Sequence, residues 1–187
     1  APVTRLDHTT SLLFKYFAGL GGTLSSVLGV FGIYDMLGQS SNWALKIICK
    51  PLPFVCEVGE GFFITQNPKI DDKTRFNDYM GHFPAGASVK SIDHYSQLIT
   101  SKHLQEFDYG KKGNLEHYGQ ETPLEVDLTR ITGKVPVAMF VGLDDDLGDK
   151  TDASWARDEI KKGGDAIDKG FYGEYELGHA SFMVAKD

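Results

Sequence analysis

Seven consecutive apolar residues in the last third of the chain constrain its fold more than any other feature. The run is Val135-Pro-Val-Ala-Met-Phe-Val141, and such runs suit strands that are buried on both faces of a parallel sheet. An acidic loop follows, then a predicted helix over residues 153–162 with an acidic start and a basic end, and then a predicted strand over residues 171–177. Strand, helix and strand in this order predict a right-handed βαβ unit with two parallel strands.

Each predicted strand ends in a polar loop, and parallel strands place such loops at one edge of the sheet. Functional groups gather at this edge in open α/β sheets. Three aspartates, 144–146, follow the first strand, and the spacing Gly142-x-x-Asp selects Asp145 as the one at the turn. Gly178-His179 follows the second strand. We therefore predict that Asp145 holds the imidazole tautomer of His179 and stabilises its protonated form.

Simpler interpretations of these loops stay open. The acidic run suits a plain solvated turn, and a glycine-flanked histidine near a chain end is often a surface residue. The run does not meet the D-x-[DN]-x-[DN]-G-x5-E pattern of a calcium loop. The remaining histidines are expected to be ordinary surface-loop residues: His8, His82, His94, His103 and His117.

A nucleophile for this pair is missing from the sequence. The G-x-S-x-G turn that presents a catalytic serine does not occur, and the nearest approach, Gly86-Ala-Ser88-Val-Lys90, lacks the second glycine. In α/β-hydrolases the chain order is Ser, Asp, His. A missing upstream serine is what a chain without its N-terminal half would show.

The first two thirds of the chain predict helices and loops. Residues 10–48 suit helices broken at 19–22 and at 38–41, and residues 87–104 have the apolar spacing of a helix. Residues 66–73 predict a polar turn, and residues 108–123, which are rich in glycine, predict a loop.

One segment in this region needs comparison with a membrane span. Residues 16–34 carry no charge and have the length of a spanning helix, but they contain five glycines and three Ser or Thr residues. An apolar cap that meets lipid or a partner, or a buried helical hairpin, is favoured over a membrane-anchored module.

Composition excludes one class of partner and leaves the cysteines open. The 187 residues suffice for one domain with a real core, and a net charge of -7 without a Lys/Arg stripe argues against nucleic-acid binding. Cys49 and Cys56 form either a local disulfide, which would indicate an oxidising compartment, or two buried thiols. Two cysteines alone make a poor zinc site, so no metal site is predicted. No signal peptide is visible, and an opening without methionine is compatible with a leader that has been removed.

Segments across nearly the whole chain resemble the acid lipases, a family that includes gastric and lysosomal acid lipase. Ala1-Pro2-Val3 looks like the end of the strand that follows the nucleophile helix in that family. His82-Phe-Pro-Ala-Gly-Ala-Ser88 is similar to its H-N-P-A-G-T-S, and Phe107-Asp-Tyr-Gly110 to its Y-D-W-G. His117-Tyr118 and Val135-Pro-Val137 match in order and spacing.

The resemblance includes both polar loops. The family segment G-G-x-D-x-L-A-D is matched by G-L-D-D-D-L-G-D, which places the catalytic aspartate on Asp145. Its N-H-x-D-F is matched by G-H-A-S-F, which places the histidine on His179. Two departures stand beside these matches: Leu143 replaces the second glycine, and Ser181 replaces the aspartate two residues after the histidine.

The resemblance implies an α/β-hydrolase fold of which this chain holds the C-terminal part. Residues 1–6 would end a core strand, residues 7–130 would form the cap and lid, and residues 131–187 would form the core segment that carries the aspartate and the histidine. The first strands, the oxyanion hole and the serine are expected upstream, as a separate chain or as another part of a longer protein. The family's cap disulfide corresponds to Cys49–Cys56.

The implied activity is hydrolysis of lipid esters, either triacylglycerols or sterol esters, by a Ser-Asp-His triad whose serine lies outside this chain. No metal or organic cofactor is needed, since serine chemistry supplies its own nucleophile and base. A lipid interface is the expected partner, and secretion or a lysosomal or vesicular lumen is the expected location. The alternative, which Leu143 and Ser181 motivate, is a catalytically inactive lipase-derived binding or structural subunit.

Overall fold

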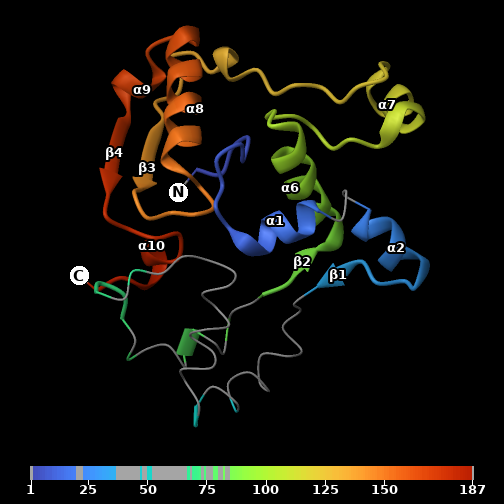
Figure 1. Cartoon of the computed structure of the whole chain (residues 1–187). Helices are drawn as coiled ribbons and strands as arrows, with labels where there is room; N and C mark the ends of the chain where they lie inside the picture. The colour runs from blue at the N-terminus through green and yellow to red at the C-terminus, as the bar shows by residue number, and fades with distance from the viewer. Residues whose placement is uncertain are drawn as a thin grey trace.

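The computed structural model describes residues 2–19, 23–36, 47, 50–51, 67, 69–72, 74, 78–79, 82 and 85–186 (Figure 1). These residues form helices and two small sheets, with these bounds: α1 Leu12–Ala18, α2 Leu24–Val30, β1 Asp35–Met36, β2 Ala87–Ser88, α6 Val89–Ser101, α7 Gly110–Tyr118, the 3-10 turn Leu128–Arg130, β3 Ala138–Gly142, α8 Lys150–Gly163, α9 Ala166–Lys169, β4 Phe171–Tyr175 and α10 Ser181–Val184. Cys49 and Cys56 lie outside the described residues, so the disulfide stays a prediction.

The predicted βαβ unit is present. β3 and β4 are parallel, with Ala138 opposite Phe171 and Gly142 opposite Tyr175, and α8 and α9 connect them. A hydrophobic core joins one face of β3 to these helices through Met139, Val141, Ala153, Ala156, Ile160, Ala166 and Ile167. β3 begins three residues later than the apolar run because Pro136 has no N–H for a ladder and Val135 is exposed.

The expectation that the apolar run is buried on both faces is wrong for the described residues. Phe140, Phe171 and Tyr175 share the other face of the sheet, and each is more than one third exposed. The ring of Phe140 lies 5.2 Å from that of Phe171 and 6.1 Å from that of Tyr175. α8 covers only the face of β3 that carries Met139 and Val141. The apolar run therefore predicted the strand correctly, but it did not indicate how many faces of the strand are covered.

The helix predicted over residues 87–104 is confirmed as α6. Its N-cap, Ser88, accepts a hydrogen bond from the Lys90 N–H at 3.2 Å. α6 packs beside α1, with the rings of Phe14 and Tyr95 5.3 Å apart. A second core cluster, Leu6, Leu98 and Leu147, joins α6 to the N-terminal segment and to the loop after β3.

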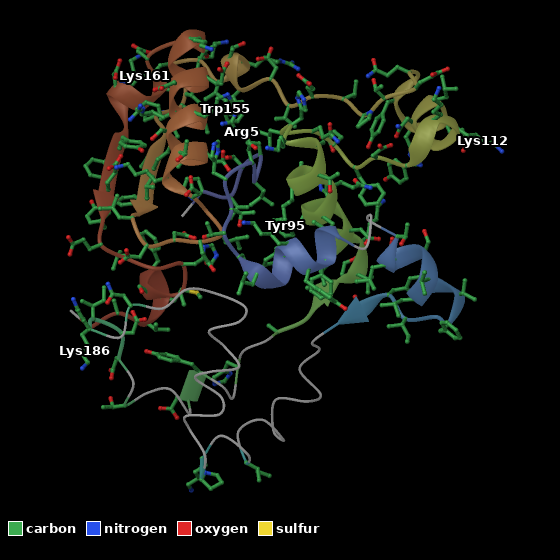
Figure 2. All side chains as sticks on the ribbon, viewed as in Figure 1. Arg5, Tyr95, Lys112, Trp155, Lys161 and Lys186 are labelled. Atoms are coloured by element: carbon green, nitrogen blue, oxygen red, sulfur yellow. The ribbon has the colours of Figure 1, made fainter. Side chains whose placement is uncertain are left out.

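Residues 2–6 pair with no strand among the described residues, so the strand end predicted over residues 1–6 stays a prediction. Side chains rather than ladder hydrogen bonds hold this segment on α8. Arg5 and Trp155 lie near each other in Figure 2. The Arg5 guanidinium is 4.6 Å from the ring centre of Trp155, and its Nε donates to Asp152 at 2.9 Å.

The loop predicted over residues 108–123 is also corrected, since it contains α7. Asn114 is buried and closes this turn: its Oδ1 accepts from the Tyr109 N–H at 2.9 Å, and its Nδ2 donates to Asp108 and to the Glu121 carbonyl. Gly119 adopts φ 73° and ends the helix, as glycine often does. Gly119 marks the end of a helix, whereas the glycine content of the segment had predicted a loop.

The predicted break between the first helices is confirmed, since α1 ends at Ala18 and α2 starts at Leu24. Both helices have seven residues. Among the described residues, no helix combines the length and the apolar character that crossing a membrane requires. Around the end of α2, Val30, Phe31 and Tyr34 are each more than 60% exposed.

Asp93 of α6 caps α2 across the interface between the helices, and its removal tests this packing. The buried carboxylate accepts from the N–H groups of Leu24 at 3.0 Å and Ser25 at 2.6 Å. We expect Asp93→Ala to lower the free energy of unfolding by about 1–2 kcal/mol, because a helix loses its cap. Denaturant unfolding measures this change. The control Asp168→Ala, at an exposed surface pair with Lys161, should change it by less than about 1 kcal/mol.

Candidate active site

Asp145 lies directly after β3 with its side chain fully buried. Its Oδ1 accepts from the backbone N–H groups of Leu147 at 3.0 Å and Gly148 at 2.7 Å. These donors favour the ionised carboxylate. Asp144 is exposed and Asp146 is half-buried, so the turn directs the aspartate selected by the glycine spacing into the molecule.

His179 follows β4 and faces Asp145. Its Nδ1 lies 2.9 Å from Oδ2 and 3.1 Å from Oδ1 of that carboxylate, and its side chain is 23% exposed. Because an ionised carboxylate only accepts hydrogen bonds, Nδ1 carries the hydrogen and Nε2 is left as the basic nitrogen. No described residue hydrogen-bonds Nε2. The structure therefore brings together the two residues that the sequence selected, in the geometry of an oriented base.

Electrostatics favour the charged form of Asp145. Burial raises the pKa of its carboxyl. The hydrogen bond from His179, the charge of His179 and the backbone N–H groups of Gly148 and Leu147 together lower this pKa by more than burial raises it. The net pKa lies below the ordinary value of 3.8. Asp145 is therefore an anion at any pH well above that value and remains available to orient the imidazole.

The two departures from the family pattern occupy different environments. The Leu143 side chain is 42% exposed, and its N–H donates to the Tyr175 carbonyl at 2.7 Å, so a side chain fits where the family has glycine. Ser181 is buried, and its Oγ accepts from the Gly178 N–H at 3.2 Å, directly beside His179. The serine thus supports the histidine loop.

Asn67, in the polar turn predicted over residues 66–73, contacts this site, and the sequence did not predict that contact. Asn67 contacts both loops: its Nδ2 donates to the Glu176 carbonyl at 3.1 Å and lies 3.4 Å from Asp144 Oδ2. Asn67 and Glu176 are 109 positions apart. No motif or periodicity marks Asn67, so the sequence offered no signal for this contact.

Four other described histidines have side-chain partners elsewhere. His94 and His117 depart from the expected loop position, since they lie on α6 and α7. Their contacts are His8 with Asp152 at 2.9 Å, His94 with the Gln105 carbonyl at 2.8 Å, His103 with Glu125 at 2.9 Å, and His117 stacked on Tyr109 at 4.0 Å.

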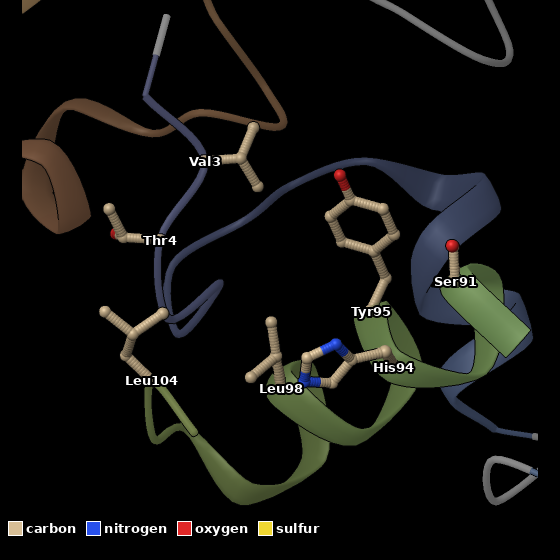
Figure 3. A pocket seen from close by; sticks show the side chains of 7 residues that line it. All are labelled: Val3, Thr4, Ser91, His94, Tyr95, Leu98 and Leu104. Carbon is tan, nitrogen blue, oxygen red and sulfur yellow. The ribbon is translucent and has the colours of Figure 1, made fainter. Parts of the chain in front are cut away.

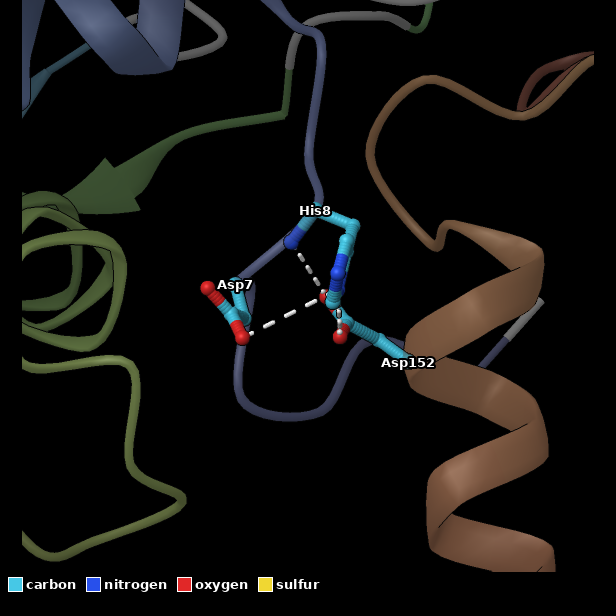
Figure 4. Close-up of side chains that lie close together, drawn as sticks. All are labelled: Asp7, His8 and Asp152. Atoms are coloured by element: carbon cyan, nitrogen blue, oxygen red, sulfur yellow. Dashed lines mark hydrogen bonds and ion pairs between the residues drawn. The ribbon is translucent and has the colours of Figure 1, made fainter.

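One described cluster has the residue types of a metal site. Ligand atoms of Asp7, His8 and Asp152 lie within 4.8 Å of one another (Figure 4). Cationic side chains already neutralise these carboxylates, since Lys102 lies 2.9 Å from Asp7 and Arg5 lies 2.9 Å from Asp152. The His8 N–H also donates to Asp152 at 2.9 Å. This cluster is an ion-pair network that fastens the N-terminal segment to α8.

A cavity of about 270 Å³ opens between the N-terminal segment and α6 (Figure 3). Neither Asp145 nor His179 is among the residues that line it. Its walls combine apolar and polar side chains: Val3, Thr4, Ser91, His94, Tyr95, Leu98 and Leu104. The described lining contains no carboxylate, lysine or arginine, and its one histidine, His94, is bound to the Gln105 carbonyl at 2.8 Å, so we assign no chemistry to this cavity.

Known proteins with similar sequences are lipases. Over 157 residues, the chain is 32% identical to the gastric triacylglycerol lipase of Rattus norvegicus, and the match covers 82% of this chain and 36% of the relative. Over 165 residues, it is 30% identical to Lipase lipl-1 of Caenorhabditis elegans, covering 82% of this chain and 39% of the relative. The chain belongs to the acid lipase-like family.

A further relative of this family is the putative lysosomal acid lipase/cholesteryl ester hydrolase of Crotalus adamanteus, which is 32% identical over 128 residues, covering 66% of this chain and 32% of the relative. The chain thus spans less than half the length of these curated acid lipase-like relatives. It matches no protein-family model.

Gly142 tests how closely the two loops must approach. A Cβ on this residue would overlap the carbonyl oxygen of Leu177 and lie 3.1 Å from the Asp145 Cβ. We expect Gly142→Ala to lower the free energy of unfolding by about 1–3 kcal/mol, because the loops must separate. Gly29→Ala is the matched control: its Cβ would meet only Tyr34 at 3.5 Å, so chemical unfolding should show an equal or higher stability. Equal losses in both variants would contradict the close approach.

The lowered pKa of Asp145 predicts a pH dependence of stability. A carboxyl whose pKa is lower in the folded protein stabilises the fold above its unfolded pKa, and this stabilisation is lost as the pH falls through the folded pKa. We expect the stability difference between wild type and Asp145→Asn to be full above the ordinary value of 3.8 and to shrink as the pH falls below it. Unfolding curves over a pH series measure this difference. A difference that does not vary with pH would contradict the assignment.

Proposed function

We propose that this chain is the C-terminal segment of a lipid ester hydrolase, in which Asp145 and His179 are two members of a Ser-Asp-His triad. The observation that carries this proposal is the 2.9 Å contact between His179 Nδ1 and Asp145 Oδ2 at the carboxyl ends of two parallel strands. Lipases among the relatives support the same reaction class.

The chemistry assigns one role to each side chain. His179 Nε2 takes the proton from a serine that lies outside this chain, while the serine oxygen attacks the ester carbonyl. The protonated imidazole then gives this proton to the leaving alcohol. Asp145 keeps the hydrogen on Nδ1 and stabilises the positive charge that the imidazole acquires. A metal or organic cofactor has no step to perform in this scheme.

The proposed fold is the C-terminal part of an α/β-hydrolase. Residues 7–130 would form the cap and lid, and residues 131–187 the core segment that carries the pair. Two parallel strands with Phe140, Phe171 and Tyr175 exposed on one face support the presence of further core structure in the whole protein. That structure would include the serine, on a separate chain or elsewhere in a longer one.

Triacylglycerols or sterol esters are the proposed substrates. One relative is named a triacylglycerol lipase and another a cholesteryl ester hydrolase. The exposed Val30, Phe31 and Tyr34 around the end of α2 suit contact with a lipid interface. Secretion or a lysosomal or vesicular lumen is the proposed location, and a Cys49–Cys56 disulfide in the cap fits such a compartment.

Replacement of His179 tests this function in the full-length protein that carries the chain. We expect His179→Ala to lower kcat for a soluble short-chain ester by about 10³-fold or more, because the serine loses its base. His103→Ala, at an exposed pair with Glu125, is the control and should keep wild-type turnover.

Labelling with a fluorophosphonate separates this function from an inactive binding subunit. A reactive serine outside this chain should be labelled in the intact wild-type protein, and His179→Ala should slow the labelling. An intact protein that takes no label would support the inactive subunit.

A further inference from the structure

A short segment from the middle of the chain is fastened to the loop that carries His179. Residues 67 and 69–72 come from the region predicted as cap, yet they lie against the end of the chain. Two backbone hydrogen bonds form this attachment, the Asp72 N–H to the Val184 carbonyl at 2.7 Å and the Lys186 N–H to the Ile70 carbonyl at 2.7 Å, and together they make an antiparallel bridge between Asp71 and Ala185. We call residues 67 and 69–72 the clasp.

The side chain of Asn67, at the start of the clasp, joins the two loops of the candidate site. Its Nδ2 donates to the Glu176 carbonyl at 3.1 Å, two residues before Gly178. The same Nδ2 lies 3.4 Å from Oδ2 of Asp144, the residue before Asp145. One amide group therefore touches the loop of the aspartate and the loop of the histidine.

The backbone of Asn67 is fixed as well. Its N–H donates to Oδ2 of the buried Asp71 at 2.7 Å, and it lies 3.3 Å from Ser181 Oγ, the same atom that accepts from the Gly178 N–H. Its Oδ1 accepts from the Lys69 N–H at 3.2 Å. With both its backbone and its amide oxygen held, Asn67 presents Nδ2 in one direction.

We propose that Asn67 is a positioning residue that sets the relative placement of Asp145 and His179 by tying their loops together. The proposal rests on the function proposed above. Backbone hydrogen bonds join only the first residues of the two loops, from the Leu143 N–H to the Tyr175 carbonyl at 2.7 Å and from the Asp144 N–H to the Leu177 carbonyl at 3.2 Å. Asn67 adds a side-chain link to this pairing, and a displacement of about 1 Å in an active site can cost about 100-fold in rate. Asn67 limits such a displacement without touching the reacting atoms.

Truncation of the side chain gives the first test in the full-length protein. We expect Asn67→Ala to lower kcat for a soluble short-chain ester by about 10- to 100-fold while KM stays within about twofold, because the base loses its alignment and the substrate keeps its contacts. Asn114→Ala is the matched control. It removes a buried amide on α7, at the opposite side of the molecule from β4, so it should lower Tm and leave kcat at 25 °C unchanged.

A second pair of variants separates positioning from general stability. Asn67→Asp replaces the donor with a carboxylate that faces Asp144, so it should lower kcat at least as far as Asn67→Ala does. Adding Asp144→Asn returns an amide donor to this contact, and kcat should recover several-fold in the double variant. If Asn67→Asp lowers Tm and kcat does not recover in the double variant, Asn67 has only a structural role and the proposal is overturned.

Comparison with His179→Ala keeps this inference distinct from the proposed function. Wild-type kcat in Asn67→Ala, with turnover abolished in His179→Ala, would overturn the positioning role and leave the triad standing. Retained turnover in His179→Ala would instead overturn the proposed function itself.

Discussion

The parallel pairing of β3 and β4 is the constraint on which the candidate site depends. Because Gly142 pairs with Tyr175, the loops after both strands begin at the same level and on the same edge of the sheet. The absence of a side chain on Gly142 then lets the second loop pass directly over the end of β3. A buried carboxylate and a half-buried imidazole meet at this crossing, each fixed by the backbone that delivers it.

Sequence patterns predicted this part of the molecule well because its determinants are local. An apolar run, a helix with opposite charges at its ends and a short glycine spacing each span only a few residues, so each leaves a pattern along the chain. The choice of Asp145 over its neighbours follows from such a spacing, and the structure places that side chain in the interior. The family resemblance selects the same residue, and the similarity of this chain to lipases is confirmed.

The predictions that were wrong depend on contacts that a local pattern does not record. Whether one or both faces of β3 are covered depends on which elements pack there, so Phe140 could not be placed from its own neighbours. α7 forms around Asn114, whose amide binds residues on both sides of the helix, and the glycine count hid this helix. Arg5 and His8 hold the N-terminal segment through Asp152, more than 140 positions away. Long-range polar contacts of this kind have no periodicity.

The clasp gives the predicted division of the chain a different meaning. The proposed boundary at residues 130–131 separates cap from core along the sequence, but residues 67, 70 and 72 are bonded to residues 176, 184 and 186 across it. The two regions are therefore not independent modules in this molecule. A chimera that took residues 7–130 from one acid lipase-like protein and the remainder from another would have to match Asn67 and Asp71 to the histidine loop they hold.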